Sequence, residues 1–104
     1  MLKRRYEILL PLNLNDGRPV SDDVQNQTRQ ELVQQFEGLS VLPQSIKGYW
    51  LHEGIQYEDV SALWTVDVED TAENRRFFRD FKKTLLQRFE QLEIYMISYP
   101  IEIE

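Results

Sequence analysis

The sequence has no cysteine, one histidine, and only four prolines and four glycines among 104 residues. The absence of cysteine excludes disulfides, thiolate nucleophiles, Fe–S ligation and Cys-based zinc sites. With a single histidine, a zinc site would consist mostly of carboxylates, so we expect no metal ion. The chain also has no glycine-rich phosphate loop and no dinucleotide fingerprint, so we expect no cofactor.

Long apolar runs are missing as well. A helix that spans a bilayer needs about 18 apolar residues in a row, and no segment approaches that length. The apolar run at residues 8–12 follows a basic N-terminal segment, as in a signal peptide, but it is short and Pro11 interrupts it. The sequence therefore predicts a cytoplasmic protein with no membrane partner.

The charge balance is acidic. Eighteen Asp and Glu residues against twelve Lys and Arg residues give a formal net charge of -6. That sign repels phosphate backbones and anionic lipids, so nucleic-acid binding would depend on a local basic patch. With 41% hydrophobic residues and no low-complexity segment, the chain has the composition of one globular domain, residues 1–104.

Hydrophobic periodicity predicts four strands and two helices. The strands are expected at residues 4–12, 45–52, 59–68 and 92–99, the last of them closed by Pro100. The first helix begins at Ser21 as its N-cap and stops at Gly38. The second begins with Asp70 as its cap and Glu73 three residues later, a variant of the capping box.

The order of these elements indicates the fold. Each helix has one apolar face, formed by Val24, Thr28, Leu32, Val33 and Phe36 in the first and by Phe77, Phe78, Phe81, Leu85 and Phe89 in the second. The order β-α-β-β-α-β predicts an α+β, ferredoxin-like fold, with a four-stranded antiparallel sheet and two helices on one face. The alternative is another α+β arrangement in which the Gly54 region is a longer loop rather than a hairpin.

A series of short motifs extends from Phe36 to Ile94. It comprises Phe36-Glu37-Gly38-Leu39-Ser40, Gly48-Tyr49-Trp50, Gly54 with Tyr57-Glu58-Asp59, and Arg88-Phe89-Glu90-Gln91. This series resembles a family of small uncharacterised bacterial proteins with the pattern F-G-G-L-T, G-x-W, a hairpin glycine with an acidic residue, and R-F-x-Q. It departs from that family at Glu37, where the family prefers glycine. The resemblance implies a bacterial, cytoplasmic protein of this fold, and it transfers no catalytic residue.

His52 and Tyr57 are the candidates for catalysis. The imidazole of His52 lies next to Glu53 in the sequence, and such a pair can act as a general base. An enzyme of this kind would resemble the dimeric α+β barrel oxygenases and isomerases, in which a pocket between sheet and helices binds a small apolar molecule. His52, Tyr57 or Tyr49 would then be the acid or base. We favour the plainer interpretation, a surface imidazole on a turn, and keep the enzyme as the alternative function.

The second helix is locally basic. Its cations occupy an arc of about 120° opposite the phenylalanines, and they are Arg75, Arg76, Arg79, Lys82 and Lys83. Such an arc can bind phosphates or an acidic partner. The plainer interpretation is a solvated outer helix face.

The sheet carries more apolar residues than one covered face requires. If Tyr6, Ile8, Leu10 and the even-numbered residues from Val60 to Val68 face the helices, the opposite face carries Leu9, Tyr49, Leu51, Leu63, Tyr95, Ile97 and Tyr99. An exposed apolar patch of that kind usually marks an interface. We therefore predict a non-enzymatic homodimer or protein-interaction domain that associates through this open sheet face.

Two alternatives remain open at this point. A one-residue shift of the second or fourth strand would exchange its two faces and shrink the patch. Binding of single-stranded RNA would require Tyr49, Tyr95 and Tyr99 to be exposed on the open face of a monomer.

Overall fold

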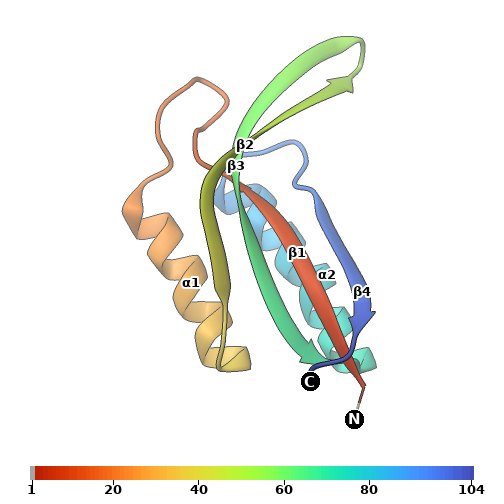
Figure 1. Ribbon diagram of the computed structural model, residues 1–104. Helices are drawn as coiled ribbons and strands as arrows, with labels where there is room; N and C mark the ends of the chain where they lie inside the picture. The colour runs from red at the N-terminus through yellow and green to blue at the C-terminus, as the bar shows by residue number, and fades with distance from the viewer. Residues whose placement is uncertain (1) are drawn as a thin grey trace.

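The structure is a computed structural model that describes residues 2–104. Its elements are β1 (Lys3–Pro11), α1 (Asp22–Phe36), β2 (Ser40–His52), β3 (Ile55–Glu69), α2 (Ala72–Arg88) and β4 (Met96–Ile101). The strands form one antiparallel sheet in the order β2-β3-β1-β4. Both helices lie on the same side of the sheet (Figure 1). The predicted ferredoxin-like fold is confirmed.

The core fills the space between the sheet and the helices. Strand residues that alternate along β1 and β3 are buried there, as expected, and they are Tyr6, Ile8, Leu10, Ala62, Trp64, Val66 and Val68. The aromatic residues of α2 meet them, with the ring of Phe78 stacked on Tyr6 at a centroid distance of 3.8 Å. The ring of Phe36, in α1, also stacks on Phe78, at a centroid distance of 5.2 Å. One aromatic layer thus joins both helices to the sheet.

The β2–β3 hairpin is longer than the sequence predicted. It begins at Ser40 and ends at Glu69, and its distal part extends past the rest of the molecule as an arm (Figure 1). Glu53 and Gly54 form its turn with φ angles of 51° and 77°, so both residues are in the left-handed region that a type I′ turn requires. The hairpin prediction is confirmed, and the longer loop around Gly54 is not formed.

The ends of α1 differ in how well the sequence predicted them. The Ser21 side chain accepts a hydrogen bond from the backbone N–H of Val24, which confirms the N-cap. The helix ends at Phe36, and the residue in the left-handed conformation is Glu37 with φ of 64°, not Gly38. For a residue with a Cβ, this conformation costs roughly 1–2 kcal/mol. This is also the position at which the resembled family has glycine.

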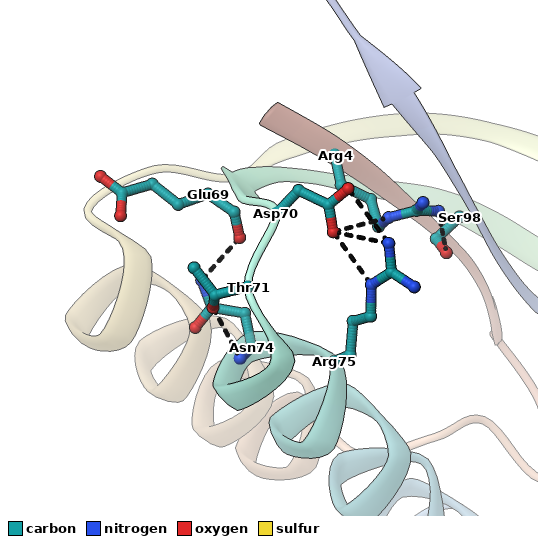
Figure 2. Close-up of polar contacts among 7 residues, drawn as sticks. All are labelled: Arg4, Glu69, Asp70, Thr71, Asn74, Arg75 and Ser98. Carbon is teal, nitrogen blue, oxygen red and sulfur yellow. Dashed lines mark hydrogen bonds and ion pairs between the residues drawn. The ribbon is translucent and has the colours of Figure 1, made fainter. Parts of the chain in front are cut away.

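The start of α2 corrects a second prediction. Thr71 is the N-cap, and its hydroxyl accepts a hydrogen bond from the backbone N–H of Asn74. Asp70 instead accepts hydrogen bonds from Arg4 at 3.1 Å and from Arg75 at 2.9 Å, as Figure 2 shows. The Arg75 guanidinium and then that of Arg4 hold the pKa of Asp70 below its usual value. Asp70 thereby attaches the start of α2 to β1.

Two prolines lie inside strands where the sequence predicted ends. β2 begins at Ser40 rather than at residue 45 and includes Pro43, which lies where the β2–β3 register is interrupted between Leu42 and Ile46. β4 begins at Met96 and continues through Pro100 to Ile101 instead of stopping before the proline. Both are edge strands, where a proline without an N–H is tolerated.

Arg88 joins the two helices. Its guanidinium donates two hydrogen bonds of 2.8 Å to the carboxylate of Glu31 and one of 3.1 Å to the hydroxyl of Thr28. Thr28 is fully buried, and its hydroxyl also donates to the Val24 carbonyl oxygen. Every polar group in this contact therefore has a partner, so the buried hydroxyl of α1 carries no unpaired desolvation cost.

Candidate functional site

The open face is the side of the sheet opposite the helices. Cross-strand partners share a face, and Leu9 is paired with Leu63 while Glu7 is paired with Ile97. Tyr99 is paired with Arg5, and the Leu9 N–H donates to the Tyr95 carbonyl oxygen. Of the predicted interface residues, the structure places on the open face Leu9, Leu63, Tyr95, Ile97 and Tyr99. Tyr95 is 61% exposed.

Tyr49 and Leu51 are on the other face of the hairpin, which corrects the predicted patch. Tyr49 is paired with Glu58, and Leu51 with Gln56, so both share the face that Ala62 presents to the helices further along β3. They are 62% and 72% exposed because this part of the hairpin is the arm, beyond the reach of the helices. An RNA platform that needs Tyr49 beside Tyr95 and Tyr99 on one face is therefore not formed.

The turn sets this outcome and could have predicted it. A two-residue loop at Glu53-Gly54 pairs His52 with Ile55, and every pair as far as Ile46 with Ser61 follows from that one. Counting back from the turn places Ile46 and Trp50 on the open face, at the positions that the sequence argument had given to Tyr49 and Leu51. The sequence predicts the hairpin, but the faces of Tyr49 and Leu51 were assigned without extending the register of the turn along β2.

The open face is polar near the start of β1 and the end of β4. Arg5 donates two hydrogen bonds to the carboxylate of Asp67, at 2.7 and 2.9 Å. The hydroxyl of Tyr99 donates to Glu7 at 2.7 Å. The hydrogen bond from Arg5 lowers the pKa of Asp67, and the hydrogen bond to Glu7 raises the pKa of Tyr99. The region formed by these two pairs, Arg5 with Asp67 and Tyr99 with Glu7, is called here the polar half.

The remainder of the open face, called here the apolar half, contains a pocket of about 320 Å³. It lies between the base of the arm and the chain that leads into β4, and its lining includes Leu9, Pro11, Ile46, Trp50, Asp59 and Tyr95. Aromatic and aliphatic side chains thus surround two carboxylates, those of Asp59 and Glu93. Pockets that hold small molecules have this mixture of apolar walls and few polar groups.

Trp50 forms one wall of this pocket. Its ring stacks on Tyr57 with centroids 4.6 Å apart and planes at 18°. Its indole N–H donates a hydrogen bond to the carboxylate of Asp59. These two contacts fix the orientation of the indole and of the carboxylate, and both residues were missed by the sequence argument as pocket residues.

The alternative enzyme needs a different pocket from this one. The pocket lies on the open face, whereas that enzyme needs one between sheet and helices. Tyr49 borders the pocket, but neither His52 nor Tyr57 is among its lining residues. His52 lies on the arm, 46% exposed in its side chain and 3.9 Å from the Glu53 carboxylate. His52 and Tyr57 therefore lie outside this pocket.

The basic face of α2 is partly neutralised. Arg75 pairs with Asp70, and Lys82 pairs with Glu93 at 2.9 Å. Among residues 2–104, the remaining cations Arg76, Arg79 and Lys83 form no ion pair. Their role toward an acidic partner stays a prediction.

From residue 2 to residue 104, no three His, Asp or Glu side chains gather into a cluster that could hold a metal ion. Over the same part of the chain, neither helix has the length and hydropathy needed to cross a bilayer.

Comparison with known proteins gives structural matches only. No protein-family model matches the chain, and no curated protein matches its sequence. CutA1 from Oryza sativa matches with a TM-score of 0.65 and 11% identity, covering 100% of this chain and 84% of that one. The divalent cation tolerance protein CutA1 from Thermus thermophilus matches with a TM-score of 0.64 and 16% identity, covering 98% and 86%. The likeness is one of fold. The resemblance to the F-G-G-L-T family stays a prediction.

Proposed function

We propose that this protein is a non-enzymatic, self-associating protein of the bacterial cytoplasm and that its open face is the surface on which a second copy binds. The supporting observation is the exposure of large apolar side chains on a sheet face that no layer of the described chain covers. Leu42, which is paired with Leu63, is 46% exposed there, and Tyr95 and Ile97 are 61% and 36% exposed. Burying such surface is the main driving force of association.

Charge pairing within the polar half reduces the repulsion that a second copy would meet. Each chain has a formal net charge of -6, so two copies repel unless their contact surface is locally neutral. On the polar half the carboxylate of Asp67 is already paired with Arg5, and that of Glu7 accepts a hydrogen bond from Tyr99. A homodimer is the smallest closed assembly, because a twofold interface uses the same patch on both copies.

Light scattering during size exclusion, over a dilution series, tests the proposal. The wild type is expected at twice the 12.5 kDa mass of one chain. Ile97→Asp and Leu63→Asp place a charge in the apolar half and are expected to give monomers that retain the far-UV circular dichroism of the wild type. Leu51→Asp is the matched control, since Leu51 is 72% exposed on the opposite face, and it is expected to leave the mass unchanged.

Two results would contradict the proposal. A wild-type protein that stays monomeric at all concentrations would leave the open face without a second copy. A dimer that Leu51→Asp dissociates and Ile97→Asp does not would move the interface to the arm. A stable larger ring that both open-face variants dissociate would retain the surface and change only the number of copies.

A further inference from the structure

The pocket on the apolar half has a charge that nothing in its lining balances. Its lining contains two carboxylates, Asp59 and Glu93, and no Lys or Arg. Glu93 is paired with Lys82, which lowers its pKa, so its charge is already compensated. Within residues 2–104, Asp59 forms no ion pair, and its partner is the uncharged indole N–H of Trp50. One carboxylate therefore faces apolar walls without a counter-charge.

The aromatic walls favour the same sign of ligand charge. A cation is attracted by the face of an aromatic ring, most strongly by that of tryptophan. Trp50 and Tyr95 both line the pocket, and Trp50 is held by its stacking on Tyr57 and its hydrogen bond to Asp59. An anion would be repelled by Asp59, and a neutral ligand would cover that carboxylate without compensating it.

We infer that this pocket binds a small organic cation: an ammonium group close to Asp59 and the ring of Trp50, with an apolar body against Leu9, Pro11 and Ile46. Its volume of about 320 Å³ lies at the lower end of the range for small-molecule sites. The chemical class is an alkyl- or arylammonium compound. All of these walls come from one chain, so the site needs no residue of a second copy, and it shares the apolar half with the proposed self-association.

Three probes with the same aromatic body and different charges test this inference. They are 2-phenylethylammonium, 2-phenylethanol and 3-phenylpropanoate, titrated calorimetrically and by tryptophan fluorescence. The other tryptophan, Trp64, is 6% exposed in the core, so a fluorescence change on binding reports mainly on Trp50. The ammonium probe is expected to bind about tenfold more tightly than the alcohol, and the carboxylate probe most weakly. Equal affinity for the three probes, or no binding of the ammonium probe, would overturn the inference.

Substitutions assign the charge preference to Asp59. Asp59→Asn is expected to remove the advantage of the ammonium probe over the alcohol and to leave alcohol binding unchanged. Glu58→Gln is the matched control, because it removes the same charge from the preceding residue of β3, which is exposed on the opposite face. A preference that survives Asp59→Asn, or that disappears equally in Glu58→Gln, would contradict the assignment.

Two further variants keep the test decisive. Tyr95→Leu changes a residue whose side chain is 61% exposed and is expected to weaken the ammonium probe severalfold without affecting the fold. Ile97 is not in the pocket lining, so titrating the Ile97→Asp variant with the same probes separates ligand binding from self-association. Binding in Ile97→Asp at wild-type affinity would show that the site is complete within one chain, whatever the state of association; loss of binding there would contradict that claim.

Discussion

The two faces of the sheet come from the same strands, but the helices cover only one of them. Between Tyr6 and Leu10 of β1 and between Ala62 and Val68 of β3, the alternate residues that face the helices are apolar and at most 6% exposed, whereas their neighbours face outward. Arg4, paired with Val68, lies at the end of this covered face. The open face is divided into a polar half around Arg5 and Asp67 and an apolar half around Leu9 and the pocket. The apolar half is the surface on which we propose that a second copy binds.

The largest expected difference between the faces is in stability. Phe78 is fully buried against Tyr6 and Phe36, so Phe78→Ala should lower the free energy of unfolding by about 3–5 kcal/mol. Ile97→Ala, on the open face, should cost less than about 1 kcal/mol in the dissociated chain. Urea unfolding at high dilution measures both. A similar cost for Ile97→Ala at that dilution would show that the open face also contributes to the fold of a single chain.

A smaller effect is expected from the contact between the helices that cover the sheet. The side chain of Arg88 is 12% exposed and holds both Glu31 and the buried Thr28 hydroxyl. Arg88→Met should therefore lower the free energy of unfolding by about 2 kcal/mol. Arg76→Met, an exposed position on the same helix, should change it by less than about 0.5 kcal/mol. Chemical denaturation tests this difference, and equal effects of the two variants would contradict it.

The smallest effect concerns the polar half and its dependence on pH. Because Arg5 lowers the pKa of Asp67 in the folded chain, the ionised carboxylate stabilises the fold at pH values above its ordinary pKa of 3.8. This contribution disappears as the pH falls through the lowered folded pKa. Asp67→Asn should thus reduce stability at neutral pH and flatten the loss of stability below about pH 4.

Denaturation at several pH values, with the double variant Arg5→Gln/Asp67→Asn as control, measures the contribution of the pair. The double variant should show the same flattened acid dependence as Asp67→Asn. An acid dependence of the single variant that equals that of the wild type would show that Asp67 does not gain stability from Arg5.

Much of the fold could be predicted from local signals. Periodicity located both helices and all four strands. Ser21 caps α1 and Glu53-Gly54 forms the hairpin turn, as predicted. The errors were at element ends. Asp70 and Thr71 are both good capping residues, and the Asp70 carboxylate is instead bound by Arg75, five residues later, and by Arg4, 66 residues earlier. A sequence window around the helix start contains Arg75 but not Arg4.

The candidate site was predicted in part. Five of the seven expected open-face residues lie there, because side-chain alternation follows directly from strand geometry. Tyr49 and Leu51 were assigned to the wrong face, although the turn register was sufficient to exclude them. The pocket itself could not be predicted, since it needs Trp50 and Asp59 from the hairpin next to Leu9 of β1 and Tyr95 of the chain before β4.

The sequence by itself determined the element order, the covered face and the acidic charge, because each of these depends on neighbouring residues or on composition alone. Tertiary structure decided which cations and carboxylates meet, and where the open face is polar or apolar. It also decided that one carboxylate in the pocket has no counter-charge. Those features depend on the pairing of β1 with both β3 and β4, which brings together residues at least 50 positions apart.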